Sequence, residues 1–206
     1  MSKQALIFQG GWEGHHPKAI ADRYAQSLEK RGYEVTVADS LDCLDDADGL
    51  AGQSLIVPNW TMGALSEERE SNLCEAVAEG VGLAGAHGGM GDAFRASLNY
   101  QYMVGGHFVS HPYVGPYTVR VDQTDHPLTR MLPERFVYDS EQYYLQVDPG
   151  NNVLLSTIYD VEGRTVDMPV AWTKSWGKGR VFYCALGHQP SEYDEHPAVW
   201  DFIVSG

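Results

Sequence analysis

The stretch Gln4-Ala-Leu-Ile-Phe8, followed by Gly10-Gly11, decides the fold class of this chain. A short apolar run that stops at glycines predicts a buried strand. Pro17 opens the next segment, in which apolar side chains recur at helical spacing, namely Ile20, Tyr24 and Leu28. Gly32 closes this helix, and the alternating pattern of Glu34–Ala38 predicts a second strand. Together these segments predict a strand-helix-strand unit.

The same alternation continues through the first half of the chain. Ser54–Pro58 and Val81–Ala86 are apolar runs that predict two further strands, and Ser66 caps a predicted helix that ends near Glu79. Parallel strands need long crossover connections, which the helices supply. The four strands therefore predict one parallel sheet with helices on both faces, and the fold class is α/β.

After about Gly115 the pattern changes to strand-like segments joined by tight turns. These segments are Tyr117–Val121, Asn152–Tyr159, Met168–Lys174 and Arg180–Leu186. They predict a C-terminal antiparallel extension of the sheet, and Pro197–Val204 predicts a last helix that packs on it. A chain of 206 residues has enough apolar surface for one sizeable core, so we expect a single domain over residues 1–206.

The composition excludes several classes of partner. The chain has 14 Lys and Arg against 28 Asp and Glu, a net charge of −14. This charge repels phosphate backbones and anionic lipid, so we expect neither nucleic-acid nor membrane partners. The apolar stretches fall far short of the roughly 20 residues that span a bilayer. The start, Met1–Gly11, lacks the features of a signal peptide, so we expect a cytoplasmic protein.

Histidines follow three of the predicted strands. His15 and His16 come after the first strand, His87 after the fourth and His188 after the last. Ligands of open parallel sheets bind beyond the carboxyl ends of the strands. We therefore expect His87 and His188 to share one pocket, with His15 or His16 on its opposite wall. A single histidine is more often structural than functional, so this interpretation depends on their shared position.

The loop after the fourth strand is the most informative of the three. Gly85-Ala-His-Gly-Gly89 has the spacing of the strand-to-helix elbow that carries a nucleophile in many hydrolases. Here the elbow residue is His87, so acyl-enzyme chemistry has no Ser or Cys at this position. We expect His87 to act as a metal ligand or as a proton-transfer group.

Several motifs resemble those of the ThuA-like, or trehalose-utilisation, family over nearly the whole chain. They are Gly85-Ala-His-Gly-Gly-Met-Gly91, Val104-Gly-Gly-His-Phe-Val-Ser-His-Pro112, Asp125-His-Pro-Leu-Thr129, Glu141-Gln-Tyr143 and the long block Pro169–His188. The resemblance implies the class I glutamine amidotransferase-like fold, a flavodoxin-like three-layer sandwich. In that superfamily the elbow holds a catalytic Cys and a His follows a later strand. His87 and His188 take those two positions, so amidotransferase activity is not implied.

The resemblance also implies a role in the catabolism of trehalose and related disaccharides, alongside oxidoreductases that make 3-keto sugars. The family commonly shows Asp-Glu-x-Tyr where this chain has Ser140-Glu-Gln-Tyr143. Glu141 and Tyr143 carry over, whereas an acidic neighbour of Glu141 does not. His111 matches the family motif, and His107 fills a variable place.

Other residues are candidates for the walls of the site. His107 and His111 have the spacing of metal ligands on a helix, but the adjacent glycines and Pro112 predict a loop. We expect His111 to line the site and to bind substrate. Aromatic side chains that could stack on sugar rings are Trp12, Trp60 and Tyr143. Packing in the core or at its rim is the alternative role of these three.

We therefore expect an enzyme that acts on a disaccharide such as trehalose, or on its keto-sugar derivative. The expected catalytic residues are His87, His188 and Glu141. We prefer a divalent metal such as zinc over a metal-free proton relay. The candidate ligands are His15, His16, His87 and His188.

Two alternatives remain. The first is a non-catalytic sugar-binding or regulatory module on an amidotransferase-like fold. The second is a cysteine hydrolase or amidotransferase, which is weaker because Cys43 lies in an acidic segment, Cys74 in a predicted helix and Cys184 within a predicted strand. The oligomeric state is open, and a homo-oligomer is one alternative.

Overall fold

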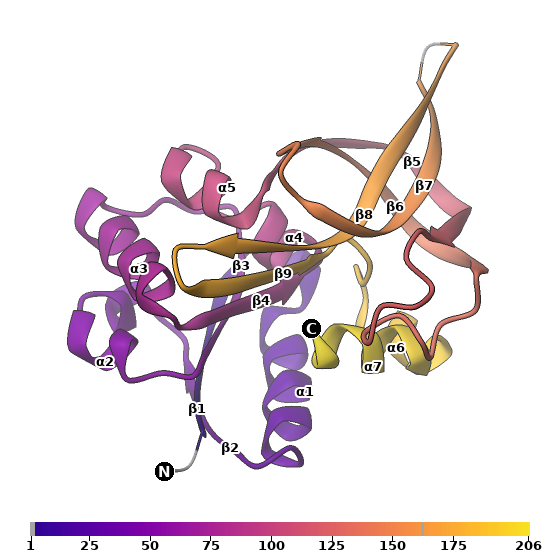
Figure 1. The fold of residues 1–206 in the computed structure, drawn as a ribbon. Helices are drawn as coiled ribbons and strands as arrows, with labels where there is room; N and C mark the ends of the chain where they lie inside the picture. Colours follow the sequence, from indigo (N-terminus) through magenta and orange to yellow (C-terminus); the bar gives the residue numbers. More distant parts are fainter. Residues whose placement is uncertain (1–2, 162) are drawn as a thin grey trace.

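The computed structural model describes residues 3–161 and 163–206, and one mixed sheet runs through them (Figure 1). In the described part of the chain the sheet has nine strands in the order β2-β1-β3-β4-β9-β8-β7-β5-β6. Its parallel half consists of β1 (Lys3–Gly11), β2 (Tyr33–Ala38), β3 (Leu55–Thr61), β4 (Gly82–Ala86) and β9 (Gly179–Cys184). The four strands predicted for the first half of the chain are confirmed.

The other half of the sheet is antiparallel. It consists of β5 (Gly106–Val121), β6 (Arg135–Val147), β7 (Asn152–Val161) and β8 (Arg164–Trp176). The predicted antiparallel extension is therefore present. The prediction that Arg180–Leu186 lies within this extension is corrected, because its strand borders the parallel half. Strand β9 pairs parallel with β4 and antiparallel with β8, so it joins the two halves.

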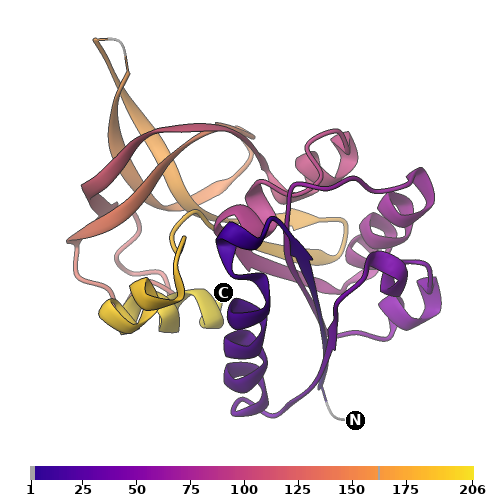
Figure 2. The ribbon, with the colours of Figure 1, turned by 180° about the vertical axis from the view of Figure 1, so that it is seen from behind.

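Helices cover both faces of the parallel half (Figures 1 and 2). Helix α1 (Pro17–Glu29) packs on β1 and β2, and beside it lies α7 (Pro197–Ser205), which confirms the predicted last helix. The opposite face carries α3 (Glu67–Glu79) with α2 (Ala47–Ala51) and α5 (Leu98–Val104). These amphipathic helices bury their apolar sides against the central strands, which form one continuous core.

Local sequence explains where these helices begin and end. Pro17 is the first residue of α1, where its missing N–H removes no helical hydrogen bond. The Ser66 side chain accepts a hydrogen bond from the Arg69 backbone N–H and caps α3, as predicted. Gly32 has a φ of 83° in the turn before β2, three residues beyond the end of α1.

Four short helical segments complete the fold. They are the 3-10 turns η1 (Glu13–His15) and η2 (Leu41–Leu44), with α4 (His87–Gly91) and α6 (Pro190–Glu195). Three of them, η1, α4 and α6, lie near the carboxyl ends of the parallel strands (Figure 1). None of the helices in the described residues is long and apolar enough to span a membrane.

Two features of the antiparallel half differ from the sequence prediction. Strand β6 was not predicted, although it carries Glu141 and Tyr143. The loop predicted around His107 and His111 is wrong, because β5 begins at Gly106 and pairs with β6. The register between these strands shifts twice between Phe108 and Tyr113. Such bulges accommodate Pro112, which cannot donate to the strand ladder.

Candidate metal and acid–base site

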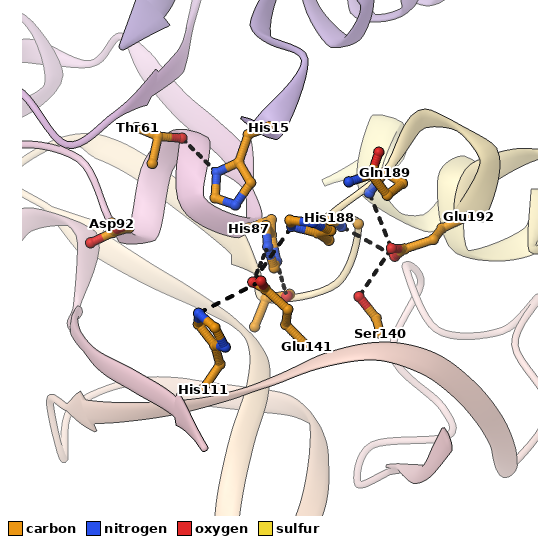
Figure 3. Close-up of polar contacts among 12 residues, drawn as sticks. His15, Thr61, His87, Asp92, His111, Ser140, Glu141, His188, Gln189 and Glu192 are labelled. Atoms are coloured by element: carbon orange, nitrogen blue, oxygen red, sulfur yellow. Dashed lines mark hydrogen bonds and ion pairs between the residues drawn. The ribbon is translucent and has the colours of Figure 1, made fainter. Parts of the chain in front are cut away.

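Four side chains converge at the carboxyl edge of the parallel strands (Figure 3). His15 ends η1 after β1, His87 begins α4 after β4, His188 follows β9, and Glu141 lies on β6. Each side chain offers one candidate ligand atom, a ring nitrogen or a carboxylate oxygen, and these four atoms all lie within 4.8 Å of one another. We call these four residues the His/Glu cluster. The predicted meeting of His87, His188 and Glu141 is confirmed.

His87 occupies the predicted strand-to-helix elbow. It has a φ of 47°, which an L-residue other than glycine seldom adopts, and its side chain is only 4% exposed. The flanking glycines make room for this turn. A Cβ on Gly85 would lie 2.9 Å from Met90, and a Cβ on Gly89 would lie 2.6 Å from the side-chain oxygen of Asn59.

The hydrogen bonds of His87 determine which nitrogen faces the cluster. Its Nδ1 lies 2.9 Å from the carbonyl oxygen of Ala185, which can only accept, so Nδ1 carries a proton. Its Nε2 lies 3.2 Å from Oε2 of Glu141. In a neutral imidazole this Nε2 would turn a lone pair toward the carboxylate. A favourable contact between these two atoms therefore requires a proton or a cation between them.

His15 contributes a second imidazole from the opposite wall. Its Nδ1 lies 2.7 Å from the hydroxyl of Thr61, and its ring is 4.8 Å from the ring of His87. The imidazole packs over Gly88, where a Cβ would lie 2.2 Å from it. Burial first, and then the charges of His87 and His188, lower the pKa of His15 to about 3. His15 is thus neutral at pH 7, the form that binds a metal.

His188 contributes a third imidazole, which is half-buried. Its buried Nδ1 lies 3.5 Å from Oε2 of Glu141 and makes no hydrogen bond with the residues that the structure describes. Burial, followed by the charge of His87, lowers the pKa of His188. A buried nitrogen without a hydrogen bond is costly, so its direction into the cluster favours a ligand at this point.

Glu141 supplies the negative charge of the cluster. Burial alone would raise the pKa of Glu141, but the hydrogen bond with His87 and the charges of the surrounding histidines lower it to about 2. Its second oxygen, Oε1, lies 3.6 Å from Nε2 of His111. The His111 side chain is 42% exposed, so it lies between the buried carboxylate and solvent.

The donor set fits a borderline divalent metal. Two ligand atoms about 2.1 Å from one tetrahedral ion lie about 3.4 Å apart. The separations of Glu141 Oε2 from His87 Nε2 and His188 Nδ1, 3.2 and 3.5 Å, match this value. Thr61 and the Ala185 carbonyl orient two of the imidazoles, as outer partners of metal-bound histidines do. His15, His87, His188 and Glu141 could therefore hold a metal such as zinc.

His16, the remaining candidate ligand, lies outside the cluster. It is exposed, has a φ of 49° and stands at the N-cap of α1. The main chain turns sharply between the two neighbouring histidines, so only His15 faces inward. Of the alternatives His15 and His16, the structure brings His15 to the site.

The three aromatic candidates lie in different environments. Trp12 is 46% exposed and packs edge-on against His15, with ring centroids 4.8 Å apart. Trp60 is half-buried, and its ring lies over Gly10 and Gly63. Tyr143 is buried, with its ring 4.2 Å from that of His87. Trp12 thus offers an open aromatic face beside the cluster, whereas Tyr143 forms part of the wall.

Sequence reasoning missed Glu192 on α6. Its buried carboxylate accepts hydrogen bonds from the backbone N–H groups of His188 and Gln189 and from the hydroxyl of Ser140 (Figure 3). The spacing of Gln189 and Glu192 around Pro190 is that of a capping box, with Gln in the place of Ser or Thr. This signal was available in the sequence and predicts the helix α6.

None of the cysteines lies in the His/Glu cluster. Burial raises the pKa of Cys43 to about 11 and those of Cys74 and Cys184 to about 12. Thiols with such values are poor nucleophiles at neutral pH. The geometry thus gives no support to a cysteine-dependent hydrolase.

These features define a mixed α/β protein with a histidine-rich site at the carboxyl edge of its sheet. The chain belongs to the ThuA family, described as trehalose utilisation, whose sequence pattern matches residues 4–206. No curated protein sequence matches the chain.

Solved structures show the same fold. A ThuA-like protein from Bacteroides uniformis ATCC 8492 is 20% identical with a TM-score of 0.74, and the match covers 97% of this chain and 89% of that one. A ThuA-like protein from Parabacteroides merdae ATCC 43184 is 18% identical with a TM-score of 0.72, covering 93% and 81%. A cytoplasmic protein from Salmonella typhimurium LT2 is 14% identical with a TM-score of 0.68, covering 98% and 95%.

Proposed function

We propose that this protein is an enzyme of carbohydrate catabolism that acts on a disaccharide such as trehalose, or on its keto-sugar derivative. Membership of the trehalose-utilisation family supports the substrate class. The observation that carries the proposal is the convergence of three imidazoles and one carboxylate at the ligand-binding edge of the sheet. Groups of this kind, brought together from distant segments and partly desolvated, are typical of active sites.

The second part of the proposal is that the His/Glu cluster binds a divalent metal such as zinc. Three nitrogen donors and one carboxylate oxygen are the ligand types that zinc prefers. Nδ1 of His188 makes no hydrogen bond among the described residues, and Nε2 of His87 lies close to Glu141, and both observations favour a cation between these side chains. When bound, the metal supplies Lewis acidity toward a carbonyl or hydroxyl oxygen of the sugar.

The chain's own residues supply positioning and proton transfer. His87 is held by Ala185 and by the packed ring of Tyr143, so its Nε2 keeps one direction. Glu141 and His111 together lead from the buried cluster to solvent, a path along which a proton can move to or from a sugar hydroxyl. The exposed ring of Trp12 is suited to stack on the C–H face of a pyranose, and His111 to bind its hydroxyl groups. Trp60 lies near the carboxyl end of the neighbouring strand β3 and is a second candidate for this contact.

The strand order supports the flavodoxin-like, class I glutamine amidotransferase-like interpretation. The parallel strands follow the order β2-β1-β3-β4-β9, which corresponds to the order 2-1-3-4-5 of flavodoxin-like sheets. His87 then takes the place of the nucleophile in that superfamily, so amidotransferase activity is not part of the proposal. We also place the protein in the cytoplasm, as the Salmonella neighbour is described.

A sugar-binding or regulatory module without catalysis is the second candidate function. The observation that favours it is the histidine at the elbow, where a nucleophile would stand in a hydrolase. Such a module would retain the aromatic and histidine contacts with sugar and would show no turnover.

One screen tests these functions. Purified protein, first analysed for metal content, is incubated with trehalose, other disaccharides and their 3-keto forms, with and without a chelator. Turnover that the chelator abolishes and zinc restores is the expected result. Saturable sugar binding without turnover would favour the second candidate function. Turnover that persists in the presence of the chelator would overturn the proposal that the reaction needs a metal.

A further inference from the structure

We infer that Glu192 is a positioning residue of this site, because its buried carboxylate ties the loop that bears His188 to the strand that bears Glu141. The inference rests on the proposed function, and it assigns a role to a residue that lies outside the His/Glu cluster. Glu192 is 8% exposed and stands on α6.

Both carboxylate oxygens of Glu192 are used. Oε2 accepts the backbone N–H of His188, and Oε1 accepts the backbone N–H of Gln189, each at 3.1 Å. These two bonds hold the segment that leaves β9 just where the imidazole of His188 turns into the cluster. A second contact from α6 supports the same segment, since the Tyr193 hydroxyl donates to the carbonyl oxygen of Gly187 at 3.2 Å.

The third bond reaches the other half of the sheet. The hydroxyl of Ser140 donates to Oε1 of Glu192 at 3.1 Å across 52 residues of sequence. Ser140 directly precedes Glu141 on β6. Glu192 therefore contacts the main chain at one cluster residue, His188, and the side chain adjacent to another, Glu141 (Figure 3).

Helix capping alone does not account for this arrangement. Of the bonds that the Glu192 side chain makes, a capping box needs only the one with the N-cap backbone N–H of Gln189. The bonds with His188 and Ser140 are additional, and all three donors point at a group that only accepts. A glutamine would place an N–H against at least one of these donors, so both acceptor oxygens of Glu192 are required.

The test compares three variants with the wild-type protein. Glu192→Gln removes one acceptor, and Ser140→Ala removes only the link to β6 while leaving the cap of α6 intact. Ser66→Ala is the matched control, because it removes a helix-capping hydroxyl outside the His/Glu cluster. Zinc affinity is measured by competition with a chromophoric chelator. Amide exchange at residues 188 and 189 and the imidazole NMR signals of His87 and His188 are measured on metal-free protein.

We expect Glu192→Gln to weaken zinc binding by about 10- to 100-fold, as the loss of an outer partner does in other metal sites. We expect Ser140→Ala to weaken it by about tenfold and Ser66→Ala to leave it unchanged. Amide exchange at residues 188 and 189 should become faster in Glu192→Gln alone. If Glu192→Gln fails to fold, Ser140→Ala decides the inference by its zinc affinity and by the imidazole signals.

The outcomes separate the two claims. If the wild-type protein binds no zinc, the metal part of the proposed function fails, and the exchange rates and imidazole signals of metal-free protein still decide the role of Glu192. Wild-type imidazole signals and wild-type zinc affinity in both site variants would overturn the positioning role. Equal losses in Ser66→Ala would overturn it as well, because they would show a general effect of stability.

Discussion

Oε2 of Glu141 lies 3.2 Å from Nε2 of His87, although 54 residues separate the two in sequence. The contact joins the antiparallel extension to the parallel half at the elbow after β4. The extension is thus part of the site, because it supplies the carboxylate that the three loop histidines surround. Each half alone would hold an incomplete set of ligands.

Replacing His87 with Ala should abolish tight metal binding and leave the fold intact. The variant loses one ligand and the hydrogen bond with Ala185, so zinc affinity should fall by at least about 100-fold. Unfolding free energy should fall by only about 1–2 kcal/mol. His16→Ala is the control, since His16 has nearly the same φ, 49° against 47°, and lies outside the cluster. Equal zinc affinity in the two variants, measured by chelator competition, would contradict the assignment.

Gly88→Ala should disturb the site through His15. The new methyl group would lie 2.2 Å from the imidazole and 3.0 Å from the Tyr143 hydroxyl, so the ring must leave its position beside Thr61. We expect a loss of about 1–3 kcal/mol in urea unfolding, together with weaker zinc binding. In the control Gly52→Ala the methyl group has no neighbour closer than 3.5 Å, so stability should stay close to wild type. A Gly88→Ala variant with normal zinc affinity would show that His15 is not a ligand.

The cysteines should be dispensable for function. Because burial raises the pKa of each thiol to about 11 or 12, native protein at pH 8 should react with a disulfide reagent roughly 100-fold more slowly than urea-unfolded protein. Alkylation of the half-buried Cys43 should leave zinc affinity and turnover unchanged. Fast labelling of one thiol with loss of turnover would restore the cysteine-dependent alternative.

Asp148 should make stability depend on pH at a place remote from the site. Its Oδ2 lies 2.6 Å from Nζ of Lys174, and this bond lowers the pKa of Asp148 below its ordinary value of 3.8. The ionised form therefore stabilises the fold above about pH 4, and this contribution is lost as pH falls through the lowered pKa. Asp148→Asn should cost about 1–3 kcal/mol at pH 7 and progressively less toward pH 3 in urea unfolding.

The matched control for Asp148→Asn is Glu79→Gln. The partner of Glu79 is Lys178, and both side chains are largely exposed, so this change should have no measurable effect at either pH. A constant difference between wild type and Asp148→Asn across the pH range would contradict the role of the charge.

Much of the parallel half could be predicted because each of its strands is a short apolar run with its own turn residues. Strand β6 lacks this signal. Residues Ser140 to Gln142 are buried one after another, which breaks the alternation expected of a half-buried strand. The position of β9 between β4 and β8 could not be predicted either, because no local pattern specifies which distant strands become its neighbours.

The sequence predicted which loops bring histidines to the site, but not every side chain that the site contains. The meeting of His87 and His188 follows from the rule that parallel strands end at one edge. The choice between His15 and His16 depends on one backbone turn, since His16 has a φ of 49° and faces solvent. Glu192 could not be connected with the site, because its partners Ser140 and His188 meet only in three dimensions.

Among the described residues, strand β9 follows the other eight strands of the sheet in sequence, yet it lies in the middle of the sheet with β4 on one side and β8 on the other. During synthesis, the two halves can therefore form early while each presents an open strand edge, and such edges are templates for aggregation. The closing step pairs residues about 100 positions apart, such as Leu83 with Val181, which slows folding. A nascent chain that has not yet paired β9 therefore exposes the edges of β4 and β8 at the same time.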